Sequence, residues 1–239
     1  MSYNILLCGV GGQGTVLASK LLAASAMENN ETVHSAETIG MAQRGGPVSS
    51  HVRIGEDVYS PLIPKHSADL LIAFEPSEAV RNLDFLKEGG AVIVNEIPMM
   101  PVSESLSPSG YTGQEMIRYL KQKIQKLAVV NAEDICAPLG SSKFFNVAVL
   151  GVALGAGFLK FEEEAVKNTI AKTVKEKFVE SNIQAFEIGK ELGQTMKPEF
   201  DVLDNVVPKR EMTEEERNKI VALEEQIQTA KERRYETKQ

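Results

Sequence analysis

The feature that most constrains this 239-residue chain is a run of glycines directly after a short apolar segment. Asn4–Cys8 reads Asn-Ile-Leu-Leu-Cys, the continuous apolar pattern expected of a central strand in a parallel sheet. The segment Gly9-Val10-Gly11-Gly12-Gln13-Gly14 follows, and from Thr15 apolar residues recur three and four positions apart, which predicts a helix. A strand, a glycine-rich turn and a helix in this order are typical of the first unit of an α/β fold.

The same alternation of strand and helix continues along the chain. Three further apolar runs predict buried strands: Asp69–Phe74, Ala91–Asn95 and Leu127–Val130. Ser77 is a candidate cap for a helix that runs through Leu86 and is closed by Gly89-Gly90, and Thr112–Glu115 has the form of a capping box for the next helix. Repeated alternation predicts an α/β protein with a Rossmann-like, doubly wound, mostly parallel sheet.

A β-hairpin is expected as an insertion in this sheet. Thr32–Ser35 is a weaker strand candidate, and residues 36–47 lack a regular period and are predicted to form a long functional loop. Val48–Ile54 alternates weakly, residues 55–57 form a plausible turn, and Val58-Tyr59 is the expected return strand.

The C-terminal part is predicted to be helical. An apolar helix is expected from about Ser142, followed by helices over Glu162–Lys177 and Ser181–Thr195. The predicted organisation is an α/β domain over residues 1–196, a linker over 197–212 with two prolines, and a charged C-terminal helical extension over 213–239. The apolar positions of that extension fit equally a helix that packs against a partner and one that folds back on its own domain.

Charge and composition exclude several classes of protein. The net charge is −7 and the pI is about 5.2, which argues against binding to nucleic acid or to an anionic membrane surface. No apolar run approaches the length needed to span a bilayer, and no secretory signal is recognised, so a cytoplasmic protein is expected. Two cysteines, Cys8 and Cys136, exclude four-cysteine iron–sulfur ligation within this chain, and the three histidines show no metal-ligand spacing.

The glycine-rich segment is a candidate phosphate site. Glycines allow a tight turn and a close approach of backbone N–H groups to a phosphate, the helix N-terminus adds partial positive charge, and Thr15 offers a hydroxyl. A tight turn that binds nothing is the alternative. A dinucleotide is less favoured than a simpler phosphate ligand, because the acidic residue that would bind its ribose has only one candidate, Glu37, just beyond the predicted second strand.

A second candidate site for an anion lies in the segment Gly40-Met41-Ala42-Gln43-Arg44-Gly45-Gly46-Pro47. The Arg44 guanidinium and the open backbone of Gly45 and Gly46 suit a phosphate or a carboxylate. An ordinary loop with one exposed arginine fits equally well. Glu75 follows a strand and fits two roles equally, a carboxylate near this edge or a cap of the next helix, and Asn95-Glu96 ends the next strand in the same way. Neither has a partner that would define a general acid or base, so no catalytic residue is predicted.

Four segments together resemble the gamma subunits of pyruvate/ketoisovalerate-type 2-oxoacid:ferredoxin oxidoreductases. These are Gly11–Gly14, Glu37–Val48, Ser50–Arg53 and Phe74–Pro76, and the match covers about residues 4–190. The sequence Ala42-Gln43-Arg44-Gly45-Gly46 followed by Ser49-Ser50-His51-Val52-Arg53 is most similar to the beta subunit of indolepyruvate oxidoreductase.

The resemblance implies a subunit, inactive alone, of an enzyme that oxidatively decarboxylates a 2-oxoacid to an acyl-CoA and reduces ferredoxin. Thiamine diphosphate and [4Fe–4S] clusters are then expected on a large partner subunit, and ferredoxin is expected to bind the complex. The preferred candidate for the 2-oxoacid is indolepyruvate or another arylpyruvate. The assembly implied is a hetero-oligomer, and a dimer is one form open to the isolated chain. By the resemblance, this chain contributes to assembly and to binding coenzyme A through Gly11, Gly12, Gln13, Gly14, Thr38, Arg44, Gly45 and Gly46.

Two other functions remain as alternatives. One is a stand-alone oxidoreductase that binds NAD(P) or a flavin, which requires turnover by the isolated chain. The other is a non-catalytic assembly module in which the glycine-rich segment is purely structural, which requires that the chain bind no phosphate ligand at all.

Overall fold

The computed structural model describes residues 2–39, 45–99 and 110–206. Its central element is a six-stranded sheet in the order β2-β3-β1-β4-β5-β6. The strands are β1 (Tyr3–Val10), β2 (Val33–Ile39), β3 (Pro47–Ile54), β4 (Ala68–Ala73), β5 (Leu86–Asn95) and β6 (Lys126–Val130). Only β3 runs against its neighbours, so the predicted mostly parallel sheet is confirmed.

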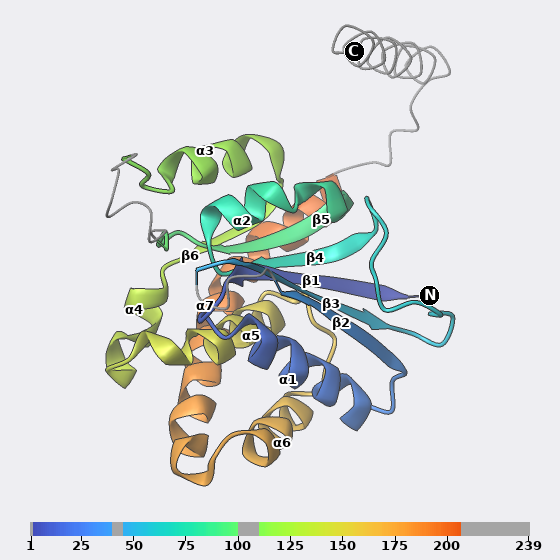
Figure 1. Cartoon of the computed structure of the whole chain (residues 1–239), viewed down its shortest axis with the longest axis vertical. Helices are drawn as coiled ribbons and strands as arrows, with labels where there is room; N and C mark the ends of the chain where they lie inside the picture. The colour runs from blue at the N-terminus through green and yellow to red at the C-terminus, as the bar shows by residue number, and fades with distance from the viewer. Residues whose placement is uncertain (1, 40–44, 100–109, 207–239) are drawn as a thin grey trace, which may run out of the picture. The chain divides into compact units, whose positions relative to one another are not determined.

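Helices cover both faces of this sheet (Figure 1). The helices α2 (Pro76–Arg81) and α3 (Gln114–Lys123) lie on one face, and on the other lie α1 (Thr15–Glu28), α5 (Phe145–Gly155), α6 (Glu163–Thr173) and α7 (Val179–Val206). A short helix, α4 (Ala132–Cys136), follows β6. This is the doubly wound α/β arrangement that the alternation predicted.

The core follows from the alternation of side chains along the buried strands. Leu6 and Cys8 of β1 belong to the apolar cluster that α3 covers with Ile117 and Leu120. Because neighbouring side chains of a strand point to opposite faces, the intervening Leu7 faces the other helical layer. Helix α5 is buried over almost its whole length, which explains why its sequence is apolar without a period.

The inserted hairpin is present, but it lies earlier than predicted. It is formed by β2 and β3, which pair from Val33 with Ile54 to Ile39 with Val48. The expected return strand at Val58-Tyr59 is wrong, and Tyr59 is 92% exposed. The physical reason is that β3 already has a partner on each side, since it inserts between β2 and β1.

Several predicted boundaries are also corrected. Strand β2 continues to Ile39, so the predicted loop cannot begin at residue 36. Gly89-Gly90 lies inside β5 rather than closing a helix, because α2 ends at Arg81 and a 3-10 turn over Leu83–Phe85 leads directly into the strand. Gly113, with a left-handed φ of 75°, occupies the N-cap of α3 without a side-chain cap, so the predicted capping box does not form.

Helix α7 extends further than predicted. It runs to Val206, through the first part of the range expected to be a linker. Its apolar contacts continue with it, since Phe200 is 4% exposed and its ring lies 4.9 Å from the ring of Phe158. The predicted charged helix at 213–239 lies outside the described residues.

Within the described residues, no single helix is long and apolar enough to cross a membrane. One bent pair, residues 132–139 and 142–155, meets the length and composition criteria only when its two parts are taken together. Its second part is the buried helix α5.

Candidate functional site

The glycine-rich turn connects β1 to α1 at the carboxyl edge of the sheet. Gly12 and Gly14 have φ values of 108° and 83°, which glycine adopts without strain, and Gly14 is the N-cap of α1. Gly9 is needed for space, because a Cβ there would lie 2.9 Å from Cβ of Phe74. The predicted turn between strand and helix is therefore confirmed, with a backbone that only glycine fits at several positions.

The free backbone donors of this turn give it the character of an anion site. Among the described residues, no acceptor bonds to the N–H groups of Gly12 and Gly14, and no side chain caps α1. The first N–H groups of a helix lack partners within the helix and carry partial positive charge. The turn thus presents several aligned donors to a negatively charged group.

Gln13 points its amide into the protein. Its Oε1 accepts a hydrogen bond of 2.7 Å from the N–H of Val10, and its Nε2 donates one of 3.0 Å to the carbonyl oxygen of Phe74. These bonds tie the turn to itself and to the end of β4. The side chain predicted as a ligand contact therefore has a positioning role within the turn.

The two glycine segments singled out in the sequence lie side by side. The N–H of Gly11 donates to the carbonyl of Gly46 at 2.9 Å, and the N–H of Gly45 donates to the carbonyl of Gly11 at 3.4 Å. This arises because β3 starts at the edge where β1 ends. Arg44 lies outside the described residues.

Thr38 lies further from the glycine turn than Gly45 and Gly46 do. It lies in β2, opposite Ser49 of β3, and β3 separates it from β1. Two strand spacings correspond to about 10 Å. Glu37, considered for a ribose contact, lies within β2 and is exposed.

A cavity of about 590 Å³ opens beside the glycine turn. Its lining joins the turn, the ends of β4 and β5, and the starts of α4 and α5: Gly12, Gln13, Gly14, Phe74, Asn95, Ile97, Pro98, Met99, Ala132, Glu133, Ser142, Lys143, Phe145 and Asn146. Asn146 and Lys143 were missed in the sequence, since no motif surrounds them. Their position appears only when α5 packs beside α1.

Asn95 holds the far side of the cavity together. Its Oδ1 accepts from the N–H of Ala132 at 3.0 Å, and its Nδ2 donates to the carbonyl of Phe74 at 3.2 Å. The predicted polar residue at the end of β5 thus joins two strand ends to α4. Glu96 accepts a hydrogen bond of 2.9 Å from Asn131, the N-cap of α4.

Glu75 is the N-cap of α2, a role for which the sequence offers both Ser77 and Glu75. Glu75 is 1% exposed, and its Oε2 accepts from the N–H groups of Ser77 and Glu78 at 2.8 and 3.1 Å. Its Oε1 accepts from the hydroxyl of Tyr111 at 2.6 Å, and burial, followed by this carboxylate, raises the pKa of that phenol. With its oxygens engaged in this way, Glu75 is a structural carboxylate rather than a general base.

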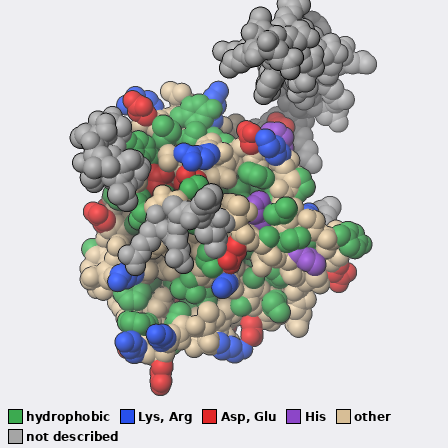
Figure 2. Space-filling model, viewed as in Figure 1, with side chains coloured by type: hydrophobic (Ala, Val, Ile, Leu, Met, Phe, Trp, Pro, Cys, Tyr) green, Lys and Arg blue, Asp and Glu red, His purple; other side chains and the backbone are tan. Residues whose placement is uncertain are grey.

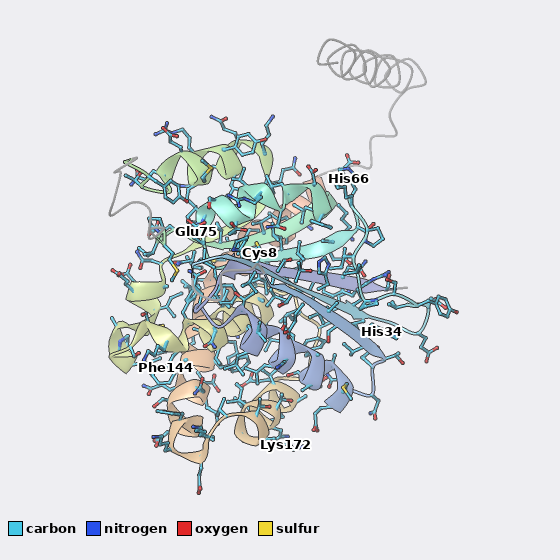
Figure 3. The ribbon with its side chains drawn as sticks, in the orientation of Figure 1. Cys8, His34, His66, Glu75, Phe144 and Lys172 are labelled. Atoms are coloured by element: carbon cyan, nitrogen blue, oxygen red, sulfur yellow. The ribbon has the colours of Figure 1, made fainter. Side chains whose placement is uncertain are left out.

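Cys8, labelled with Glu75 in Figure 3, lies in β1 and contacts the helix α2 that Glu75 caps. Its thiol donates to the carbonyl of Glu78 at 3.4 Å. Burial, with the carboxylates of Glu78 and Glu75 adding to it, raises the pKa of the Cys8 thiol well above its usual range. The thiol is therefore neutral and not a nucleophile.

The described residues hold no group of three histidine, cysteine or acidic side chains that would bind a metal ion. On the face shown in Figure 2, positive and negative side chains of the described residues are interspersed rather than gathered by sign. The polar groups at the carboxyl edge are backbone donors, amides, one lysine and the carboxylate of Glu133. The backbone donors at a helix N-terminus suit an anionic organic ligand.

Comparison with known proteins identifies the family and agrees with the fold. Residues 4–192 match the family described as pyruvate ferredoxin/flavodoxin oxidoreductase. Indolepyruvate oxidoreductase subunit IorB of Archaeoglobus fulgidus is 41% identical over 190 residues, which cover 79% of this chain and 94% of that protein. The pyruvate/ketoisovalerate oxidoreductases common subunit gamma of Thermococcus litoralis is 32% identical over 184 residues, covering 75% and 92%.

Two solved structures share the fold. The keto/oxoacid ferredoxin oxidoreductase gamma subunit of Geobacter sulfurreducens aligns with a TM-score of 0.59 and 24% identity, over 81% of this chain and 99% of that one. The 2-oxoglutarate:ferredoxin oxidoreductase of Magnetococcus marinus, solved with 2-oxoglutarate, coenzyme A and succinyl-CoA bound, aligns with a TM-score of 0.62 and 19% identity. The alignment covers 81% of this chain and 31% of that larger chain.

The chain belongs to the pyruvate ferredoxin/flavodoxin oxidoreductase family, and its α/β fold is that of the family's gamma subunits. It is a subunit of a 2-oxoacid:ferredoxin oxidoreductase complex. The resemblance seen in the sequence motifs is confirmed.

Proposed function

We propose that this chain is the small subunit of an oxidoreductase that acts on indolepyruvate or another arylpyruvate, and that its glycine edge binds a phosphate group of coenzyme A. The choice of substrate is supported by similarity, since the indolepyruvate relative is 41% identical and the pyruvate/ketoisovalerate relative is 32% identical. The choice of ligand is supported by the chemistry of the edge.

The observation that carries the proposal is a set of N–H donors that have no partner among the described residues. They belong to Gly12 and Gly14, which line the cavity, and to the start of α1. A helix N-terminus with a glycine-rich turn is a common site for phosphate in proteins. The neighbouring residues Gly45 and Gly46 are fixed against this turn by two hydrogen bonds, which supports a shared site at this edge. The chain's own contribution is to bind and orient the acyl acceptor.

The redox chemistry is assigned to a partner subunit. Cys8 and Cys136 are the two cysteines of the chain and both are buried, so this chain's residues do not fit a four-cysteine cluster. Thiamine diphosphate and [4Fe–4S] clusters on a large partner would supply decarboxylation and electron transfer to ferredoxin. The isolated chain is then inactive.

The proposal is tested by purifying the chain alone and together with its large partner subunit. We expect arylpyruvate-dependent and coenzyme A-dependent reduction of ferredoxin by the complex only. Faster turnover of pyruvate than of arylpyruvates would overturn the substrate assignment. Turnover of NAD(P) or a flavin by the chain alone would favour a stand-alone oxidoreductase instead.

The ligand assignment is tested by substitution within the turn. Gly12 has a φ of 108° and an added Cβ there would meet no atom within 4 Å, so Gly12→Ala strains the turn and enters the space in front of it without a packing clash. We expect the KM for coenzyme A to rise at least about tenfold, which is a loss of about 1.4 kcal/mol. Arg44→Ala, chosen from the sequence, is expected to weaken use of coenzyme A while the subunits still assemble. An unchanged KM in both variants contradicts the assignment.

A further inference from the structure

Strand β2 forms one edge of the sheet and leaves its outer hydrogen-bonding groups open. It is the first strand in the order β2-β3-β1-β4-β5-β6, so only one of its sides has a partner strand. The N–H of Gly55 donates to the carbonyl of Thr32, which makes Thr32 a bonded position of the antiparallel pair. Because bonded and non-bonded positions alternate along such a pair, Val33, Ser35 and Glu37 direct their N–H and C=O groups away from β3. These groups have no partner among the described residues.

This edge lacks the features by which proteins keep an exposed strand from pairing. Such strands are usually protected by lysine, proline, a bulge or short length. Strand β2 reads Val-His-Ser-Ala-Glu-Thr-Ile, seven residues without lysine or proline, and its register with β3 is unbroken. The opposite edge differs, because β6 has five residues and begins with Lys126. The edge of β2 is therefore able to accept a further strand.

The outer face of helix α1 is apolar, although α1 lies at the surface. Its half-buried and exposed residues form one stripe by their helical spacing: Val16, Lys20, Ala23, Ala24 and Met27. Lys20 is the one charge in this stripe, and Met27 is 65% exposed. A surface helix normally carries polar residues on this face, and a helix that is apolar all round is normally covered. Figure 1 shows α1 beneath β2 and β3, so the stripe belongs to the same end of the sheet as the open edge.

A second copy of this chain complements the open edge. A two-fold axis at Ser35 would pair Ser35 with its equivalent and Val33 with Glu37 of the second copy, so that each outward N–H meets an outward carbonyl. Each Glu37 then lies opposite an apolar residue, apart from the other Glu37. The charges of Lys20 on the stripe and Glu37 on the edge cancel, although the whole chain carries −7. Two copies can therefore meet here without the repulsion that their net charge would produce elsewhere.

The size of the face agrees with a reversible interface. The seven residues of β2 span about 23 Å, and the sheet with one helix layer is about 20 Å deep, so the face covers about 450 Å² per copy. Two copies would bury about 900 Å², close to the roughly 1,000 Å² of a small specific interface. We therefore expect a dissociation constant in the micromolar range.

We propose that the edge of β2 and the outer face of α1 form a two-fold interface with a second copy of this chain, in which the sheet continues from one copy into the other. The strands supply directional hydrogen bonds, and the stripe on α1 supplies apolar area. The residues of this interface do not line the cavity beside the glycine turn, so the inference does not rest on the coenzyme A assignment.

The first test measures the mass of the purified full chain by sedimentation equilibrium between about 1 and 100 μM. The wild type should shift reversibly from 26.1 kDa toward twice that mass. Ser35→Pro removes an outward N–H and leaves the hydrogen bonds to β3 in place, whereas Ser35→Ala keeps the N–H and is the matched control. We expect Ser35→Pro to raise the dissociation constant at least about tenfold and Ser35→Ala to leave it unchanged.

A second variant tests the helix and stays informative if Ser35→Pro does not fold. Met27→Lys places a charge on the apolar stripe, and a lysine in the last turn of a helix is favourable to the helix itself. Tyr119→Lys is its control, because Tyr119 is a 43% exposed side chain of α3 in the other helical layer. Met27→Lys should also raise the dissociation constant at least about tenfold, and Tyr119→Lys should not.

Amide hydrogen exchange, followed by nuclear magnetic resonance, identifies the strands in contact. The outward amides of Ser35 and Glu37 should exchange at least about tenfold more slowly at 100 μM than at 1 μM, whereas those of His34 and Ala36, which face β3, should be slow at both concentrations. A wild type that stays monomeric throughout this range overturns the inference. So does a dimer whose outward amides stay unprotected, or one that both Met27→Lys and a folded Ser35→Pro leave unchanged.

Discussion

Substitution of Gly189 by alanine tests how α7 fixes the position of α5. The two helices cross at backbone contact distance, and a Cβ added at Gly189 would lie 1.9 Å from the carbonyl oxygen of Ala148 and 3.1 Å from the N atom of Val152. Gly193 meets α5 in the same way, at 2.3 Å from the carbonyl oxygen of Val152. Each added atom meets backbone atoms of α5 and not side chains, so no side-chain rotation relieves the clash.

The magnitude follows from two opposing effects. Alanine in place of glycine favours a helix by about 1 kcal/mol. Against this, the helices must separate by about 1.5 Å to bring the new Cβ to ordinary contact distance, and forced separation of a packed core costs about 3–5 kcal/mol when cavity formation is added to strain. We therefore expect Gly189→Ala to lower the free energy of unfolding by about 2–4 kcal/mol and the melting temperature by roughly 5–15 °C.

The assay is chemical and thermal denaturation followed by circular dichroism. Ala171→Gly, at an exposed position of α6, calibrates the helix-propensity contribution alone and should cost about 1 kcal/mol. Ala148 is one half-turn from Asn146, which lines the cavity. Displacement of α5 should therefore also weaken the proposed binding of coenzyme A. A Gly189→Ala protein as stable as the wild type, or more stable by the propensity gain, would refute the close crossing.

Four further outcomes are expected. Gln13→Glu removes the N–H donor to the end of β4 and should lower the free energy of unfolding by about 1–3 kcal/mol in urea titration, whereas the exposed Gln122→Glu should not. Cys8 and Cys136 should resist thiol reagents at pH 8 until the protein is denatured. The reason is that burial raises the pKa of both thiols, that of Cys136 to about 11. One fast-reacting thiol in the folded chain disproves this. The raised Cys136 pKa also predicts a stability contribution that is complete below the ordinary thiol pKa of 9.0 and is lost as the pH rises toward about 11. Burial lowers the pKa of His51 below its ordinary value of 6.5. The neutral imidazole therefore contributes stability above pH 6.5, and this contribution is lost as the pH falls through the pKa of the folded state. His51→Gln should flatten the acid side of a plot of unfolding free energy against pH.

The turn from β1 into α1 was predictable because its signals are local. The apolar run, the glycines and the following helical period lie within a few residues of one another, and positive φ at Gly12 and Gly14 requires no distant partner. The same locality made the buried strands β4 and β5 visible as continuous apolar runs. Their polar ends at Glu75 and Asn95 were also predictable, and so was the cap as one of two roles for Glu75, whereas the hydrogen bonds of Asn95 were not.

The hairpin was misplaced because strand pairing is a non-local choice. The local pattern predicts Val48–Ile54 as the first strand of a hairpin. In the structure, β3 pairs on one side with β2 and on the other with β1. Local turn signals at residues 55–57 favoured a return that the sheet does not use. A distant contact, between Phe200 and Phe158, likewise packs α7 beyond its predicted end at Thr195.

The sequence by itself determined the class of fold, the conformation of the glycine turn and membership of the oxidoreductase family, because backbone preference and hydrophobic period are properties of short segments. Only the tertiary structure decided which polar groups meet at the carboxyl edge. It turned Gln13 inward to the end of β4, and it brought Asn146 from α5 against Gly14. The physical reason is that the positions of these side chains depend on how two helices pack on one face of a sheet, through contacts between residues far apart in the chain.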